Sequence, residues 1–204
     1  MSTFPTTSTT LLAKLAELET GVDQSAWSRF FELYQPVMVE FARAKGAGDD
    51  AEDVVQEVFA DVVKVFREGK YVRERGRFRS YLATMLRNEL ISRFRRMRSR
   101  PEGSALQISD SGVIDSPDVP RMAADGSRTH EEAAWDASCH KVALRHVLTK
   151  TALSEQSRRI YRELIETGDS CAEVARRLGI PAATVRQVKS RVSRMIVAYE
   201  KEIS

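Results

Sequence analysis

Residues Ser170 to Tyr199 read SCAEVARRLGIPAATVRQVKSRVSRMIVAY, and this stretch decides the fold of the C-terminal part of the chain. Ser170 and Glu173 have the spacing of a capping box, in which the Ser hydroxyl accepts from the Glu173 backbone N–H and the carboxylate accepts from the cap N–H. Gly179 supplies a left-handed turn at little steric cost, and Pro181 suits the first turn of the next helix, where its missing N–H is no loss. The pattern predicts two helices joined by a tight turn, a helix-turn-helix.

The second of these helices is predicted from Ala182 to about Tyr199 and has an apolar stripe at Val185, Val188, Val192 and Ile196. Outside the stripe stand side chains suited to base edges and phosphates in a major groove. They are Thr184, Arg186, Gln187, Lys189, Ser190, Arg191 and Arg194. A solvated basic face on a bundle helix is the alternative explanation. The coincidence of the cap, the glycine turn, the apolar spacing and a small Ala175 where the helices cross favours DNA binding.

The rest of the chain, working outward, also has helical periodicity. Apolar residues recur at three- and four-residue spacing up to Phe41, over about 50–67, over 78–94, over 131–150 and over 154–167. Asp49, followed three residues later by Glu52, is expected to cap the helix near residue 50. Trp135 is expected at the packing edge of the C-terminal bundle.

A segment rich in Pro, Gly and Ser at 101–130 has few large apolar residues, so it cannot bury enough surface to fold alone. We therefore predict an all-α protein made of two small helical bundles joined by a flexible linker. The predicted parts are an N-terminal tail with a short helix at 1–24, a helical domain at 25–100, the acidic linker at 101–130 and the helix-turn-helix domain at 131–204.

Charge is sorted by segment, although 32 basic and 29 acidic residues nearly balance over the whole chain. Twelve Lys or Arg residues stand against three Glu residues over 67–100, and seven stand against one over 176–201. Two basic blocks predict two contacts with a polyanion, because each neutralised phosphate releases counterions.

An acidic stripe lies on the predicted helix that begins with DAEDVVQEVF, residues 50–59. Asp53, Glu57 and Asp61 stand at i, i+4 and i+8 with Gln56 beside them, so they share one face. Taken alone, a solvated face is the simpler interpretation.

The order of the motifs adds context. DAEDVVQEVF, then FRSYLATMLRNELISRFRR at 78–96, then an acidic linker and a basic helix-turn-helix together resemble regions two and four of sigma-seventy family factors. The resemblance covers about 25–100 and 131–200, and the short form is similar to an extracytoplasmic-function sigma factor. It implies a bacterial cytoplasmic protein that directs promoter recognition and transcription initiation with core RNA polymerase.

The resemblance also implies roles for particular residues. The acidic face would bind the clamp helices of the largest polymerase subunit, through Asp53, Gln56, Glu57 and Asp61. The loop at 70–77 and the helix after it would capture the minus-ten strand, through Arg79, Asn88, Ser92, Arg93, Arg95 and Arg96. The recognition helix would read the minus-thirty-five element through the seven residues named above. The flap region of polymerase and an anti-sigma factor are further implied partners. Phe78 and Tyr81 are candidates for base stacking, although their place in the apolar stripe favours core packing.

Other classes of protein explain less. A helix-turn-helix regulator that acts without core polymerase remains open, but it leaves the basic block at 67–100 without a role. We find no paired carboxylates in an apolar setting, no GxSxG and no phosphate loop, so we expect no catalytic residue and no cofactor. We expect no membrane insertion, since no run of about 20 apolar residues occurs.

His130, Cys139, His140 and His146 are close in sequence, but the adjacent Cys139 and His140 point to different faces of a helix. We therefore expect no metal site there. Two cysteines are also too few for a disulfide scaffold.

Overall fold

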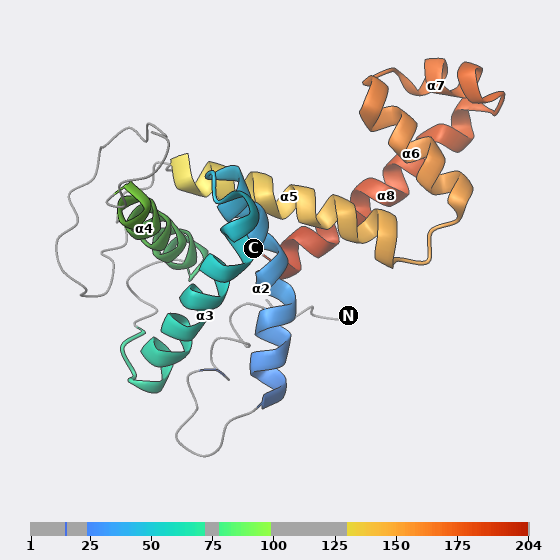
Figure 1. Ribbon diagram of the computed structural model, residues 1–204. Coiled ribbons are helices and arrows are strands. Elements are labelled where there is room, and N and C mark those ends of the chain that lie inside the picture. The colour runs from blue at the N-terminus through green and yellow to red at the C-terminus, as the bar shows by residue number, and fades with distance from the viewer. Residues whose placement is uncertain (1–14, 16–23, 72–77, 99–129, 204) are drawn as a thin grey trace. The chain divides into compact units, whose positions relative to one another are not determined.

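The computed structural model describes residues 15, 24–71, 78–98 and 130–203, and no strand occurs among them. Its helices are α2 (Gln24–Ala44), α3 (Ala51–Arg67), α4 (Phe78–Arg98), α5 (His130–Lys150), α6 (Glu155–Thr167), α7 (Cys171–Leu178) and α8 (Ala182–Ile203), with a 3-10 turn η2 (Gly48–Asp50) ahead of α3 (Figure 1). The predicted all-α fold is confirmed. Most of the predicted tail and linker lies outside the described residues, so both remain predictions.

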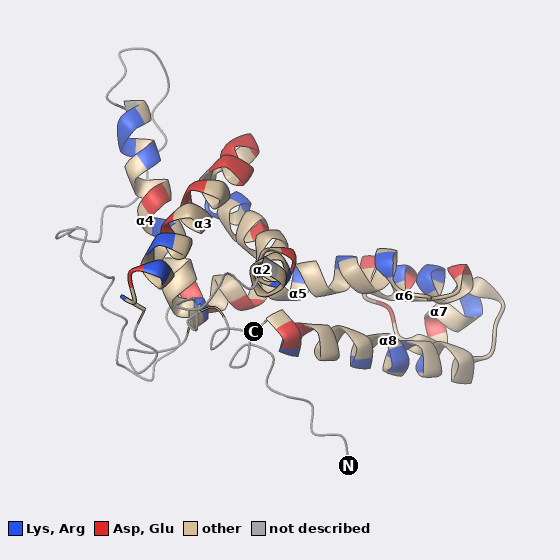
Figure 2. Ribbon diagram, turned by 90° about the horizontal axis from the view of Figure 1, so that it is seen from below, with Lys and Arg blue, Asp and Glu red and all other residues tan. Residues whose placement is uncertain are grey.

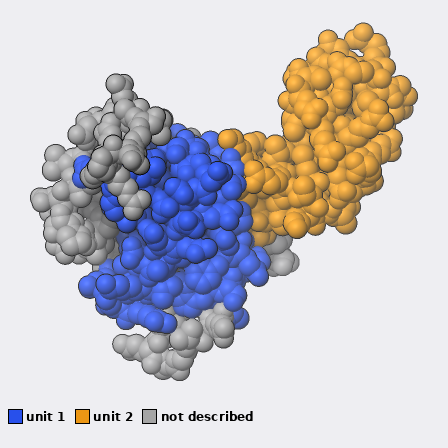
Figure 3. Space-filling view, viewed as in Figure 1, with its two compact units in different colours: residues 1–138 blue, residues 139–204 orange. Residues whose placement is uncertain are grey.

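The chain forms two compact units, residues 1–138 and 139–204, and the boundary falls inside α5 (Figure 3). In the N-terminal unit α3 packs on α2, and α4 packs on both. Aromatic rings join the helices: Phe78 of α4 lies with its ring centroid 5.7 Å from Phe30 and 5.8 Å from Tyr34 of α2.

The apolar face of α3 is buried as the spacing predicts. Its buried residues are Ala51, Val54, Val55, Val58, Phe59, Val62 and Phe66. Burial of each large apolar side chain contributes roughly 1.5–3 kcal/mol. This sum fixes the rotation of α3 and turns its polar face outward.

The start of α3 differs from the sequence prediction. Asp49 does not cap the helix, because Gly48–Asp50 already turns as η2 and Asp50 is the N-cap residue. The Asp50 side chain makes no capping hydrogen bond. Its carboxylate instead pairs with Arg93 of α4 at 3.3 Å, so a tertiary ion pair replaces the local cap.

The C-terminal unit has the helix ends that the sequence predicts. Ser154 caps α6 by accepting from the Ser157 backbone N–H, and α6 ends at Gly168 with φ +69°. Ser170 and Glu173 form the full capping box at the start of α7, and Gly179 ends α7 with φ +66°. The short segment 179–181 then leads into α8, whose buried side includes the whole predicted stripe from Val185 to Ile196.

Trp135 lies elsewhere than expected. Its side chain is 1% exposed, and its ring centroid is 5.7 Å from that of Phe41 on α2, within the N-terminal unit. The later part of α5, with Ala143, Val147 and Leu148, packs in the core of the C-terminal unit. Periodicity shows that one side of α5 is buried, but it does not identify the partner. The two ends of α5 therefore serve different cores.

Candidate nucleic-acid interface

The four residues of the predicted acidic face, Asp53, Gln56, Glu57 and Asp61, are all exposed on α3. They lie opposite the valines that pack the helix on α2 and α4, so core packing sets their direction. Figure 2 shows acidic residues along α3 and basic residues along α4. The structure therefore brings these four residues together on one surface.

The basic residues of α4 do not form one surface. Arg93 faces α3, where its Nη2 lies 3.3 Å from an Asp50 oxygen and 3.8 Å from an Asp53 oxygen. Its Nη1 lies 3.6 Å from a Glu57 oxygen. Arg96 also approaches Glu57, at 4.0 Å. Two arginines predicted to bind DNA thus pair with carboxylates predicted to bind polymerase.

Glu89 completes this cluster and was not singled out from the sequence. It pairs with Arg96 seven residues further along α4. Burial, followed by a hydrogen bond with Glu57, raises the pKa of Glu89. The seven-residue spacing places Glu89 and Arg96 on one side of α4, which was the available signal.

Arg79, also in the predicted minus-ten set, lies on another flank of α4. Its Nη1 is 3.7 Å from an oxygen of Asp136 on α5, and only 19% of its side chain is exposed. The start of α5 therefore covers part of the predicted strand-binding helix.

Asn88, Ser92 and Arg95 occupy a third side of α4, at the i, i+4 and i+7 spacing of one helical stripe. Asn88 and Ser92 are partly buried, and Arg95 is exposed. This stripe combines an amide, a hydroxyl and a guanidinium, which together can hydrogen-bond base edges and phosphates.

Phe78 and Tyr81 lie in the core, at 6% and 2% exposed. Tyr71, in the segment before α4, stacks on Phe66 with centroids 4.9 Å apart and lies 5.8 Å from the Tyr81 ring. Burial raises the pKa of Tyr81 to about 12. These rings anchor the start of α4, and neither Phe78 nor Tyr81 is placed to stack on a base. Residues 72–77 of the loop at 70–77, predicted to help capture the minus-ten strand, lie outside the described residues.

Six of the seven predicted readers on α8 are exposed, and Thr184 is partly buried. Among them, Arg191 also reaches another helix of the same unit. Arg191 Nη2 donates to Ser157 Oγ of α6 at 2.8 Å, and Ser157 is 5% exposed. The structure therefore places Arg186, Gln187, Lys189, Ser190 and Arg194 outward, and ties Arg191 to α6.

The candidate metal ligands make separate contacts with other residues. Cys139 is buried, and its thiol donates to the Ile203 carbonyl at 3.8 Å. His140 Nδ1 lies 2.6 Å from Glu200, and the His146 ring stacks on Tyr199 with centroids 4.0 Å apart. The His130 side chain is not among those described. Each of the three described side chains thus has its own partner.

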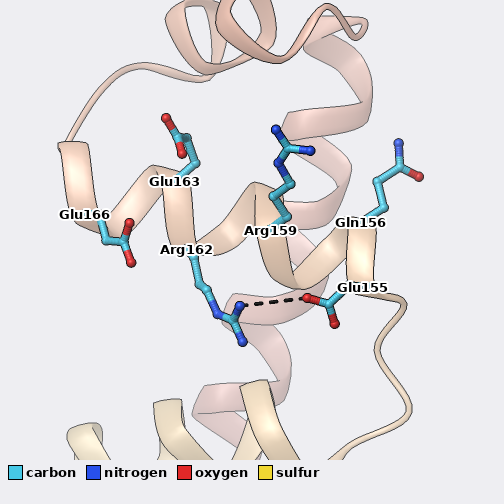
Figure 4. Close-up of a pocket in the computed structure, with 6 residues that line it drawn as sticks. All are labelled: Glu155, Gln156, Arg159, Arg162, Glu163 and Glu166. Atoms are coloured by element: carbon cyan, nitrogen blue, oxygen red, sulfur yellow. Dashed lines mark ion pairs between the residues drawn. The ribbon is translucent and has the colours of Figure 1, made fainter.

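A surface hollow lies along α6 (Figure 4). The side chains that line it are Glu155, Gln156, Arg159, Arg162, Glu163 and Glu166. Arg162 pairs with Glu155 at 3.8 Å. All six come from one helix and mix both signs of charge, so we assign no ligand to this hollow.

The described residues thus form an all-helical protein, with an acidic helix paired to a basic one, α3 and α4, in one unit and an exposed basic and polar side on α8 in the other. Residues 30–100, which include most of α2 and all of α3 and α4, match the family model of sigma-70 region 2. This match supports a sigma factor of the sigma-70 family, whose members take part in promoter recognition and transcription initiation by RNA polymerase. A search of curated proteins found no match. None of the helices in the described ranges is long and apolar enough to cross a bilayer.

Proposed function

We propose that the chain is a bacterial sigma factor of the extracytoplasmic-function type. It binds core RNA polymerase through the acidic face of α3, captures the minus-ten strand on α4 and reads the minus-thirty-five duplex with α8. The observation that carries the proposal is the outward acidic face of α3 beside the basic helix α4, inside the residues that match sigma-70 region 2.

The polymerase contact rests on the four exposed residues of α3. Charged groups at the rim of an interface chiefly govern encounter and register. Asp53 and Glu57 each form an ion pair with Arg93, so their substitution also removes a contact within the unit, whereas Gln56 and Asp61 are exposed residues of the same helix. Gln56 and Asp61 are therefore the more direct test of docking on the clamp helices.

The minus-ten contact rests on Asn88, Ser92 and Arg95. A surface that binds unpaired bases offsets the unstacking of a base, which costs roughly a few kcal/mol, and so favours the open strand. The chain itself carries out no covalent step in this scheme, because the polymerase supplies the chemistry.

The minus-thirty-five contact rests on the exposed basic and polar side of α8. The glycine turn and the buried valines orient this helix, and its outward Arg and Gln side chains match the donors that read guanine and adenine in a major groove. A helix-turn-helix regulator would use α8 in the same way, so α8 does not separate the two functions.

The test is promoter-directed initiation with purified chain and core polymerase on templates carrying varied minus-ten and minus-thirty-five sequences. We expect RNA synthesis that requires both proteins, with unpaired thymines appearing near the minus-ten element. Footprinting of duplex DNA by the chain alone, with no effect on initiation, would establish the regulator instead.

Variants on α3 sharpen this test. A Gln56→Ala, Asp61→Ala chain should lose core affinity and initiation while its melting temperature stays unchanged. Glu166→Ala, an exposed acid on α6, is the matched control and should leave core affinity unchanged. Equal core affinity in both variants would remove α3 as the docking surface.

A further inference from the structure

Three donors on one flank of α4 are met by three carboxylates from the start of α5. Arg79 Nη1 lies 3.7 Å from Asp136, and Arg87 Nε lies 3.6 Å from Glu131. Ser80 Oγ donates to Glu132 at 2.9 Å. All three contacts lie within the N-terminal unit.

An apolar anchor holds this contact in register. Trp135 is 1% exposed against Phe41, and the neighbouring Ser138 is 2% exposed. Exposed ion pairs alone contribute little to stability, but a buried tryptophan fixes which side of α5 faces α4. The three polar contacts are therefore part of a defined interface.

Helix electrostatics explain only part of the pattern. Acidic residues in a first turn interact favourably with the N-terminal end of the helix dipole, which accounts for Glu131 and Glu132. The effect falls off within the first turn, so it does not account for Asp136. It also does not explain why an arginine, a serine and a second arginine of α4 meet these carboxylates.

The chemistry of the contact is that of a phosphate site. Guanidinium and hydroxyl donors bind phosphate oxygens and carboxylate oxygens with similar geometry. Arg79 belongs to the predicted minus-ten set, and Arg87 lies one residue before Asn88 on the same helix. A strand bound to this flank of α4 would need the donors that α5 now occupies.

We propose that the first two turns of α5 act as an intramolecular substitute for nucleic-acid phosphates, so that docking of α5 on α4 and strand capture by α4 exclude each other. This inference rests on the proposed function, because it takes a single-stranded nucleic acid as the competitor. Strand binding then requires the start of α5 to leave α4, which exposes Trp135.

The first experiment neutralises the acidic turns in the full chain with Glu131→Gln, Glu132→Gln and Asp136→Asn. The ligand is a single-stranded oligonucleotide carrying minus-ten sequences selected by initiation, and binding is followed by anisotropy over a range of salt. We expect three- to tenfold tighter binding than wild type. The matched control carries Glu32→Gln, Glu155→Gln and Glu166→Gln, which changes net charge equally at exposed sites and should alter affinity less than twofold.

The second experiment reads the anchor directly. The chain has two tryptophans, so Trp27→Phe leaves Trp135 as the sole tryptophan, whose emission is excited selectively. Saturating oligonucleotide should shift the Trp135 emission to longer wavelength and increase its quenching by acrylamide. If Trp27→Phe does not fold, the difference between the wild-type and Trp135→Phe spectra gives the same signal.

The outcomes separate this inference from the proposed function. Strand binding with an unchanged Trp135 signal, or equal affinity in the neutralised and control variants, would overturn the exclusion and leave initiation intact. Failure of the neutralised variant to bind any strand would also overturn it. Loss of chain-dependent initiation, measured separately with polymerase, would overturn the proposed function.

Discussion

Arg191 can act in either of two ways, and the contact with Ser157 separates them. As a base reader it would contact guanine in the major groove. As a positioning residue it would hold α8 against the start of α6, where the Ser157 hydroxyl it binds lies 2.9 Å from the hydroxyl of the capping residue Ser154. The observed 2.8 Å hydrogen bond to a buried acceptor favours positioning.

The magnitude follows from that hydrogen bond. A hydrogen bond within a protein contributes about 0.5–1.5 kcal/mol net, and more when one partner is charged. The Arg191 side chain is exposed and keeps part of its hydration, so we take about 1 kcal/mol, close to a fivefold change in an equilibrium constant. Loss of a bidentate arginine contact to guanine would instead cost roughly 1–3 kcal/mol at one base pair only.

The perturbation is a double-mutant cycle of Arg191→Ala and Ser157→Ala in the full chain. We expect both single variants to lower the stability of the C-terminal unit, with a coupling free energy of about 1 kcal/mol. Both should weaken binding to a minus-thirty-five duplex by a similar factor for every single-base variant, because a misplaced helix weakens all sequences alike. Arg186→Ala is the control, since this exposed arginine should relax the preference at one base pair and leave unfolding unchanged.

The assays are thermal unfolding and duplex binding across all single-base variants of the element. If Arg191→Ala relaxes the preference at one position while Ser157→Ala leaves binding unchanged, Arg191 reads a base and the positioning role is refuted. A coupling free energy near zero would point the same way.

Three further predictions concern stability and charge. Arg93→Ala should lower the free energy of unfolding of the N-terminal unit by roughly 1 kcal/mol, since the acidic cluster loses its central cation, whereas Arg95→Ala, at an exposed position, should weaken strand binding more than it lowers the melting temperature. Glu89 has a raised pKa in the folded chain, so protonated Glu89 stabilises the fold and this stabilisation is lost as pH rises through the folded-state pKa. The melting temperature of Glu89→Gln, measured between pH 4 and 8, should therefore depend less on pH than that of the wild type. An unchanged pH dependence would contradict this role of Glu89. Ser170→Ala should cost about 1 kcal/mol by removing the cap of α7, seen as a lower melting temperature and weaker duplex binding at every sequence.

The helix ends of the C-terminal unit could be predicted from the sequence because their causes are local. A cap depends on side chains three residues apart, and a left-handed turn depends on one glycine. Ser154, Gly168, Ser170 and Gly179 therefore stand in the structure where the sequence places them. The inward side of α3 was predictable for a related reason, since helical period and apolar spacing fix it.

The partners of the helices could not be predicted in the same way. Trp135 and Phe41 are far apart in sequence. Helical periodicity predicts that Trp135 is buried, but it does not identify the unit whose core contains it. Asp50 shows the same limit. The local sequence allows its carboxylate either to cap α3 or to pair with a cation from another helix, and in the structure it pairs with Arg93 of α4. Such choices depend on the packing of whole helices, which a local pattern does not contain.

Charged residues show the same limit in the predicted site. Charged residues at helical spacing are predicted to share one face. The spacing does not show which of them form ion pairs within the protein. On α4, Arg79 pairs with a carboxylate from α5 and Arg93 with carboxylates from α3, so a ligand must displace those carboxylates before it can bind the arginine. The free energy of that displacement opposes binding, and the same arginine contributes less than its charge suggests. Asn88 and Ser92 are uncharged, so strand binding there breaks no ion pair. Substitutions at these two residues therefore test strand contact more directly than substitutions at the arginines.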